Sequence, residues 1–283
     1  MNSELVAKQQ VRDFWENHPL CSFEIAASSE AKSYFEEHDR LKREDTDLFC
    51  LHLWQFDRYP GKRVLDVGCG PGWLIRNYAQ NGALIVGVDL TYQAVQMAKR
   101  SLELYGLKGY VIQADAENLP FATDTFDFVS SSGVLHHTPD TQKAIGECHR
   151  VLRPNSNSVI SLYYKNILLQ RFTFPLLRIF LRLLKDVPGR HKLKNPASIE
   201  EFVRVYDGDE NPIGKAYSKS QCRQMFDQFS IKAMEIHFFP NRFLVFPVPR
   251  FVHRLLDHWF GTMIYMIMRK PAAQSLTQKE IKV

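Results

Sequence analysis

The stretch from Val64 to Gly72 carries the residues with the clearest chemical meaning in this chain. Its first half is apolar and β-prone, as a buried parallel strand requires, and alternate glycines follow at Gly68, Gly70 and Gly72. Alternate glycines let the backbone pass close to a ligand, and the helix that follows points free N–H groups toward it. The carboxylate of Asp66, on the strand, suits a ligand with a cationic end better than a pyrophosphate.

Two further carboxylates follow the next two predicted strands. Asp89 closes the strand at 84–88, about 20 residues after the first glycine, where it can accept hydrogen bonds from ribose hydroxyls. Asp115 follows the strand at 110–113 and can reach an adenine amino group. A ribose-containing ligand leaves two classes open, a nicotinamide or flavin dinucleotide enzyme and an S-adenosylmethionine (SAM) enzyme. The G-x-G-x-G spacing differs from the G-x-G-x-x-G that places a pyrophosphate at a helix start.

Strand and helix patterns alternate through the middle of the chain. Predicted strands lie at 63–67, 84–88, 110–113, 126–131, 157–163, 231–237 and 262–268. Predicted helices lie at 4–17, 33–59, 72–80, 91–105, 140–152 and 218–227, with another beginning at Pro175. Such alternation predicts an α/β protein with a doubly wound, parallel sheet.

With these motifs in this order, the chain resembles the class I SAM-dependent methyltransferases. The closest likeness is to the small-molecule branch that includes ubiquinone/menaquinone-biosynthesis and sugar O-methyltransferases. The resemblance lies within 62–164, about a third of the chain, and rests on Val64–Gly72, Gly87–Asp89, Gln113–Phe121, Phe126–Val129, Ser132–His137 and Arg150–Pro154. Where the family usually has two glycines after Leu-Arg-Pro, this chain has Asn155-Ser156-Asn157, which we interpret as a turn variant.

The resemblance implies a Rossmann-like class I methyltransferase fold, with a seven-stranded, mostly parallel sheet whose last strand is antiparallel. It also implies a helical N-terminal lid and a cap inserted after the fifth strand. SAM is the implied cofactor. The implied cofactor-binding residues are Asp66, Gly68, Cys69, Gly70, Gly72, Asp89, Leu90, Asp115, Ala116, Ser131 and Ser132.

Two adjacent histidines are candidates for acid–base chemistry. His136 and His137 follow the fourth predicted strand, at the edge where open α/β sheets bind ligands. A histidine there could take the proton that a hydroxyl or ammonium acceptor must lose. Adjacent residues that leave a strand point in different directions, so we expect one of them to face the acceptor; alternatively, both are structural. Some similar sugar O-methyltransferases carry a carboxylate after the fifth strand, where this chain has Tyr163, which could orient the acceptor.

Two other groups of residues could contact ligands, although packing or turn formation would also explain them. Residues of the predicted lid could close over bound SAM, and these are Trp15, His18 and Tyr34. A polar loop could read polar groups of an acceptor through Tyr206, Asp207, Asn211 and Tyr217. The five cysteines have no C-x-x-C spacing, so the sequence predicts neither a zinc site nor another metal centre.

The segment from Asn166 to Pro196 is strongly basic. Seven lysines and arginines stand there against one acid, Asp186, a net charge of +6 in a chain whose total is +5. Arg178, Arg182 and Lys185 form one stripe on an otherwise apolar helix, and residues 243–260 form a second basic, apolar stretch. Segments 171–194 and 243–260 could contact an anionic membrane, cap the substrate pocket or form a dimer contact.

We expect five parts: a helical N-terminal lid at 1–60, a SAM-binding core at 61–165, a basic helical cap at 166–230, final strands at 231–270 and a disordered tail at 271–283. Apolar residues make up 45% of the chain and charged residues 24%, as in ordinary soluble globular proteins. The polar N-terminus lacks a signal-peptide core, and no apolar run reaches the ~18 residues of a membrane-spanning helix. These features predict a cytoplasmic protein, with peripheral membrane contact as one alternative.

The predicted function is methyl transfer from SAM to a small-molecule, or lipid-like, acceptor. An RNA or protein methyltransferase is the second class, but the basic segment is interleaved with aliphatic side chains, so no nucleic-acid partner is expected. A SAM-fold protein without methyl transfer is the third class. The acceptor atom and the oligomeric state are left open by the sequence.

Overall fold

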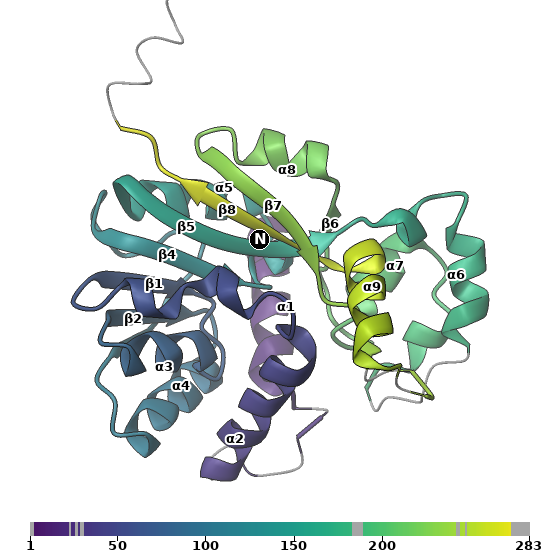
Figure 1. Ribbon diagram of the computed structural model, residues 1–283, viewed down its shortest axis with the longest axis horizontal. Helices are drawn as coiled ribbons and strands as arrows, with labels where there is room; N and C mark the ends of the chain where they lie inside the picture. Colours follow the sequence, from purple (N-terminus) through teal and green to yellow (C-terminus); the bar gives the residue numbers. More distant parts are fainter. Residues whose placement is uncertain are drawn as a thin grey trace, which may run out of the picture.

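The computed structural model describes residues 3–22, 24–25, 28, 31–182, 189–241, 244–246 and 248–272. Its centre is a sheet with the strand order β3-β2-β1-β4-β5-β8-β7 (Figure 1). The strands are β1 (Arg63–Val67), β2 (Leu84–Asp89), β3 (Tyr110–Gln113), β4 (Phe126–Ser132), β5 (Leu152–Tyr164), β7 (Ser230–His237) and β8 (Met263–Arg269). Only β8 runs antiparallel to its neighbours, so the predicted seven-stranded sheet with an antiparallel last strand is confirmed. A two-residue strand, β6 (Ala216–Tyr217), also pairs with β5.

Helices cover both faces of the sheet. They are α1 (Ser3–Asn17), α2 (Lys32–Leu41), α3 (Trp73–Gln80), α4 (Tyr92–Leu104), α5 (Thr141–Val151), α6 (Phe174–Leu181), α7 (Ile199–Val205), α8 (Lys219–Met225) and α9 (Arg250–Phe260). Val64 and Phe128 pack with α3 and α4 on one face, whereas Leu65 and Val129 pack with α5 and α8 on the other. Because β1 and β4 are covered on both faces, consecutive apolar residues of each strand, such as Val64 and Leu65 or Phe128 and Val129, are buried on opposite faces.

The predicted helix at 33–59 is wrong beyond Leu41. After α2 the chain forms a π-helical turn at Lys42–Thr46 and then only short 3-10 turns. The chain turns here because Asp47 is buried, where it pairs with Lys42 at 3.0 Å and accepts a hydrogen bond from Tyr265 of β8 at 3.1 Å.

The helices beyond the sheet come from two insertions. The turn Ile167–Leu169 and helices α6 and α7 lie between β5 and β6, and α9 lies between β7 and β8, on the right of Figure 1. The predicted helix start at Pro175 is within one residue of α6. Lys185 and Asp186 of the basic segment, and the tail beyond residue 272, lie outside the described residues.

Candidate active site

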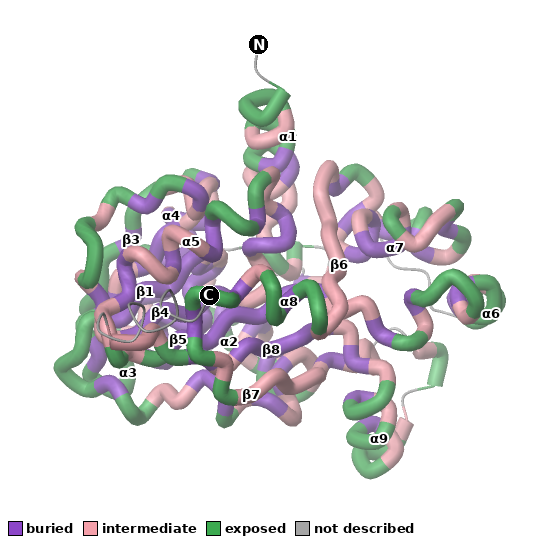
Figure 2. The backbone as a smooth tube through the Cα atoms, turned by 90° about the horizontal axis from the view of Figure 1, so that it is seen from above, coloured by how far each residue is buried: buried purple, intermediate pink, exposed green. Residues whose placement is uncertain are grey.

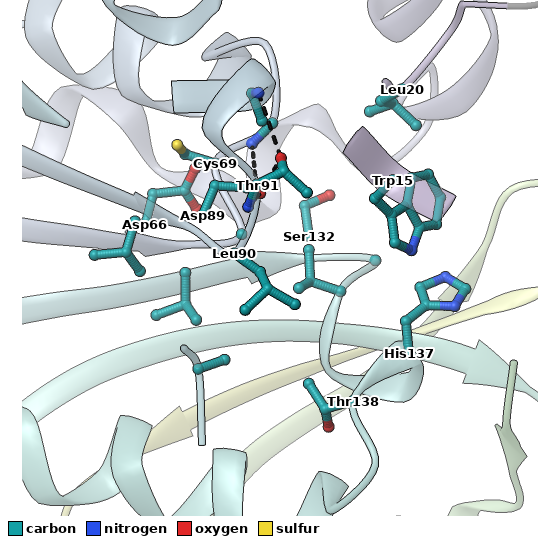
Figure 3. A pocket seen from close by; sticks show the side chains of 18 of the residues that line it. Trp15, Leu20, Asp66, Cys69, Asp89, Leu90, Thr91, Ser132, His137 and Thr138 are labelled. Atoms are coloured by element: carbon teal, nitrogen blue, oxygen red, sulfur yellow. Dashed lines mark hydrogen bonds between the residues drawn. The ribbon is translucent and has the colours of Figure 1, made fainter. Parts of the chain in front are cut away.

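A cavity of about 160 Å³ opens at the carboxyl ends of β1, β2 and β4, and α1 contributes to its wall. Trp15 of α1 and His137 meet at one end, with ring centroids 5.1 Å apart, and Asp89 and Thr91 lie at the other (Figure 3). Predicted site residues that line this cavity are Asp66, Gly68, Cys69, Gly70, Asp89, Leu90, Asp115, Ala116, Ser132 and His137. It is the edge at which open α/β sheets bind ligands.

The loop between β1 and α3 requires glycine at Gly68 and leaves space at Gly70. At Gly68 φ is +74°, and an added Cβ would lie 2.4 Å from the side chain of Val134. At Gly70 φ is +49°, and an added Cβ would meet nothing within 4 Å. Glycine adopts such angles without strain, so the backbone can approach a ligand closely at this point.

The Asp89 carboxylate ties the end of β2 to the glycine loop. One oxygen accepts from the Gly70 amide at 3.0 Å, and the other accepts from the amide and hydroxyl of Thr91 at 3.0 and 2.9 Å. The Thr91 side chain in turn caps α4. These bonds hold the carboxylate in one orientation at the cavity wall.

Asp66 is an almost completely buried carboxyl group at the cavity. Burial raises its pKa to about 7, and neighbouring Asp89 contributes to this rise, although the hydroxyl of Ser130 donates to it at 2.8 Å. A buried carboxyl group with so little compensation is suited to a positively charged ligand.

Helix α1 is fixed over the cavity through its own charged residues. Lys8 contacts Asp115 at 2.6 Å and the buried Glu117 at 2.7 Å. Glu16 accepts from the amides of Tyr92 and Gln93, at the start of α4, at 2.8 and 3.0 Å. The predicted adenine-binding Asp115 therefore also holds the N-terminal helix.

Of the residues expected to bind SAM or to act in catalysis, four lie outside the cavity lining: Gly72, Ser131, His136 and Tyr163. Gly72 precedes α3, and the Ser131 hydroxyl donates to the Val67 carbonyl at 2.8 Å. The Tyr163 amide donates to Nδ1 of buried His136 at 3.3 Å. Burial, with His137 and Lys215 nearby, lowers the pKa of His136 well below its usual range, so His136 stays neutral.

His137 is the histidine that faces the cavity, and both of its ring nitrogens face acceptors. Nδ1 lies 2.6 Å from the carbonyl oxygen of Ile213, and Nε2 lies 3.2 Å from Asp207. The Tyr163 hydroxyl also donates to Asp207. Burial raises the pKa of Asp207, but the bond with His137 and the charges nearby outweigh this effect and leave the pKa below its ordinary value. The structure thus brings together His137, Tyr163 and a carboxylate from the loop after α7.

His38 of α2 also lines the cavity, although the sequence did not predict it as a site residue. It is buried, and neither ring nitrogen has a hydrogen-bond partner in the part of the chain that the structure describes. Burial lowers the pKa of His38 to about 3, so its ring is neutral and has one donor and one acceptor to offer a ligand. The sequence around His38 carries no pattern that indicates this role.

Residues 65–160 match the protein family described as "Methyltransferase domain". The chain is 33% identical over 175 residues to a ubiquinone biosynthesis O-methyltransferase of Hahella chejuensis, an alignment that covers 56% of this chain and 71% of that protein. The chain belongs to the class I SAM-dependent methyltransferase family.

Two further comparisons extend this finding. A malonyl-[acyl-carrier protein] O-methyltransferase of Enterobacter lignolyticus is 33% identical over 132 residues, which cover 46% of this chain and only 49% of that enzyme. The chain thus spans about half the length of this relative. A solved complex of the Haloferax volcanii Trm112 methyltransferase activator with a methyltransferase matches with a TM-score of 0.58 at 15% identity, covering 92% of this chain and 97% of that chain. At this identity the likeness shows the methyltransferase fold alone.

SAM, the cofactor of this methyltransferase family, fits the residues around the cavity. It carries a positive sulfonium and ammonium, and the cavity wall contains Asp66, Asp89, Asp115 and Glu117. The carboxylate of SAM needs a donor, which the unpartnered ring of His38 can supply. Among the described residues no cluster of His, Cys, Asp and Glu could hold a metal ion.

Proposed function

We propose that this protein transfers the methyl group of SAM to a small-molecule acceptor that has a hydrocarbon part. The single observation that carries the proposal is the cavity at the strand ends, which combines buried carboxylates at one end with His137 at the other. The relatives' names, malonyl-[acyl-carrier protein] and ubiquinone biosynthesis O-methyltransferase, support an acceptor of this kind.

The sulfonium of SAM supplies a methyl group that is already activated for in-line displacement, so catalysis depends chiefly on positioning. Asp66 would hold the ammonium group, Asp89 the ribose hydroxyls and Asp115 the adenine amino group. His38 would donate to the carboxylate. Gly68 and Gly70 would let the backbone approach the ligand.

His137 would remove the proton of the acceptor. Its Nδ1 can bond the Ile213 carbonyl at 2.6 Å only by donating, which leaves Nε2 as the nitrogen with a lone pair. Nε2 faces Asp207 at 3.2 Å, so the proton of the acceptor would be taken up by the His137–Asp207 pair and held between Nε2 and the carboxylate. Tyr163 holds Asp207 from the other side and acts as a positioning residue.

Asp89 provides a direct test of this cofactor assignment. Asp89→Ala removes acceptors for two ribose hydroxyls, so SAM should bind at least tenfold more weakly, as expected for ~1.5–3 kcal/mol of bonds to a charged group. Isothermal titration of SAM checks this, with Asp57→Ala, an exposed carboxylate outside the cavity lining, as the matched control. Unchanged SAM affinity in a folded Asp89→Ala protein would refute the assignment.

The second part of the proposal, contact with an anionic membrane, rests on helix α9. An ordinary surface helix buries its apolar side, but α9 buries His253 and Asp257 and exposes Phe251, Leu255 and Trp259. The buried polar pair is satisfied: His253 donates to the Phe239 carbonyl at 2.9 Å, and Asp257 lies 2.7 Å from His237. The apolar side of α9 therefore faces outward, which is the reverse of the usual orientation of a surface helix.

The segment around α6 adds exposed apolar residues at the same end of the molecule. Phe172, Leu176 and Ile179 are 90%, 68% and 63% exposed, and α6 and α9 occupy the same end of the molecule, far from β1 and β3 (Figures 1 and 2). Among the described residues of 166–194 and 244–260 the one carboxylate is the buried Asp257, whereas the exposed charges include Arg171, Arg182, Arg250 and Arg254. We call these exposed apolar and basic residues of α6 and α9, with Arg171 and Phe172, the α6–α9 surface. Basic and aromatic residues on an apolar helix face fit the interface of an anionic bilayer. No helix in the described part of the chain has the length and apolar character needed to span a bilayer.

Replacing Arg250 and Arg254 together by glutamine should weaken co-sedimentation with phosphatidylglycerol vesicles about 30-fold at low salt, since each basic residue near the surface contributes roughly 1 kcal/mol. The double variant Arg58→Gln with Arg223→Gln changes the charge equally at exposed positions elsewhere and should bind as the parent does. If the parent protein does not co-sediment with these vesicles even at low salt, the membrane part of the proposal is wrong.

The function itself is tested by transfer of tritiated methyl from SAM into a fractionated cell extract. Mass spectrometry then identifies the labelled product. Label in the lipid or small-molecule fraction supports the proposal. Label confined to RNA or protein contradicts it, and so does the absence of transfer in any fraction.

A further inference from the structure

Lys215 lies between α7 and β6, outside the lining of the cavity at the strand ends. Its amino group nevertheless donates to two backbone carbonyls of residues that line this cavity, those of Thr138 at 2.8 Å and Pro139 at 2.7 Å. The hydroxyl oxygen of Thr141, at 3.4 Å, is a third oxygen beside it. Lys215 thus uses its hydrogen-bond donors to hold the loop that follows His137, and not to bind a ligand in the cavity.

The same short segment also holds the ring of His137. The carbonyl of Ile213, two residues before Lys215, accepts from Nδ1 of His137 at 2.6 Å. Residues 213–215 therefore contact one loop at two points, which are the ring of His137 and the backbone of the two residues that follow it. Because both contacts come from one segment, a shift of this segment would move the ring and the loop backbone together.

The end of α7 fixes the position of this segment. At Gly214 an added Cβ would lie 2.7 Å from the carbonyl oxygen of Val203 and 2.8 Å from the Cα of Arg204, so this close approach requires glycine. Buried Asn211 adds two hydrogen bonds: its side chain donates to the Arg204 carbonyl at 2.8 Å and accepts from the Ile213 amide at 3.3 Å. The backbone of α7 therefore determines where the Ile213 carbonyl lies.

The sheet fixes the segment from its other end, where β6 lies beside β5 (Figure 1). Ala216 pairs with Tyr163 of β5, and the Tyr217 hydroxyl donates to the Thr141 hydroxyl at 2.9 Å. Thr141 in turn donates to the carbonyl of Leu135 at 3.0 Å, at the start of the turn that carries both histidines. The loop after β4 is thus held near each end, and the bonds from Lys215 reach its middle.

This loop affects the acceptor side of the cavity more than the cofactor side. Thr138 lies beside His137 in the cavity wall (Figure 3), whereas Asp66 and Asp89 belong to β1 and β2. In-line transfer requires the acceptor atom, the methyl carbon and the sulfur to be collinear, and a displacement of about 1 Å can greatly reduce the rate. Movement of this loop should therefore slow the transfer and leave most cofactor contacts in place.

We propose that Lys215 is a positioning residue for methyl transfer: by bonding the Thr138 and Pro139 carbonyls, it keeps His137 directed at the acceptor. This inference rests on the proposed function. Without the amino group of Lys215, two half-buried carbonyls lose their donor, and the loop would rearrange to bond them to water. The effect of Lys215 should appear in turnover and in the state of the His137 ring, and hardly in the affinity for SAM.

Lys215→Met tests this role, because it keeps most of the aliphatic part of the side chain and removes the donor. We expect turnover, measured as transfer of tritiated methyl from SAM into the labelled fraction of the extract, to fall about tenfold. The affinity for SAM, measured by isothermal titration, should change less than about threefold. Lys232→Met removes the same charge at an exposed position on β7 and should behave as the parent protein does.

A proton resonance separates the positioning of His137 from a general loss of stability. The Nδ1 proton of His137, held by the 2.6 Å bond to Ile213, should give a downfield signal that exchanges slowly with solvent and is missing in His137→Ala. We expect the same signal in the parent protein and in Lys232→Met. In Lys215→Met it should exchange roughly tenfold faster or more, because local opening of the loop would break the bond to Ile213.

The proposal is overturned if turnover in Lys215→Met equals that in Lys232→Met. A lower turnover with an unchanged Nδ1 signal overturns it as well, since Lys215 would then act on something other than His137, and so does a parent protein that lacks this signal. If Lys215→Met does not fold, Lys215→Gln, which can still donate one bond, is judged by the same results. Failure of the proposed function is a different outcome: the parent protein then transfers no methyl, whereas the Nδ1 signal is measured without an acceptor.

Discussion

Replacing His137 by alanine should lower kcat about 100-fold or more while the affinity for SAM changes little. The expectation follows from the ring's two contacts: the Ile213 carbonyl keeps a proton on Nδ1, and Asp207, which faces Nε2, stabilises the imidazolium formed when Nε2 takes a proton. Asp207→Asn keeps the size of the side chain but removes this charge, so it should lower kcat as well. Steady-state kinetics with the labelled acceptor, together with SAM titration, checks both variants.

The neighbouring histidine provides the comparison for His137→Ala. His136 is buried outside the cavity lining and accepts from the Tyr163 amide, so His136→Asn should reduce kcat far less. Equal, small effects of the two substitutions would contradict a proton-transfer role for His137.

SAM should bind about 50-fold more weakly at pH 5 than at pH 7, because the Asp66 carboxyl group must ionise to hold the ammonium group. Burial raises the pKa of Asp66 in the ligand-free protein to about 7, so below this pH the site must first lose a proton. Asp66→Asn should bind SAM weakly, with an affinity that hardly varies between pH 5 and pH 7. Isothermal titration over this range measures both curves.

The same raised pKa has an opposite effect on folding. Since the pKa of Asp66 in the folded protein lies above its ordinary value near 4, the stabilisation associated with the protonated carboxyl group is complete below pH ~4 and is lost as the pH rises through 7. SAM should therefore raise the melting temperature more at pH 7 than at pH 5. A SAM-induced shift that is the same at both values would contradict an ionised Asp66 in the complex.

The central sheet could be predicted because its signals are local. Strands β1 to β4 are short β-prone runs with a glycine or a carboxylate at the end or within two residues after it, and their observed bounds differ from the predicted ones by one residue at most. Strand β5 begins five residues earlier than predicted, at Leu152, because the polar run 153–157 is typical of a turn. Its pairing with β4 shifts register between Phe126 and Phe128, which no local pattern indicates.

The candidate base could be predicted only as a pair of residues. The sequence places His136 and His137 at the sheet edge, but the choice between them depends on contacts with Ile213 and Asp207, which are about 70 residues away along the chain. Asp207 was a candidate for reading the acceptor and not for pairing with a histidine. His38 carried no signal of its own, because its role follows from burial that the packing of α2 against the cavity creates.

The orientation of α9 shows a further limit of sequence patterns. Its spacing of apolar and basic residues predicts an amphipathic helix, and such a helix would ordinarily turn its apolar side inward. His253 and Asp257 reverse this orientation because Phe239 and His237 offer them partners on the protein side. Those partners lie 14 and 20 residues earlier in the chain.

This reversed orientation separates the position of the helix from the chemistry of its exposed side, two properties that single substitutions usually change together. His253 and Asp257 hold α9 in place, whereas Phe251, Leu255 and Trp259 form its exposed side. Substitutions on the exposed side could therefore change its preference to another lipid composition, or to another protein. The position of the helix and the stability of the sheet would stay the same. A designer could likewise exchange the three displayed residues for polar ones to increase solubility without redesigning the core.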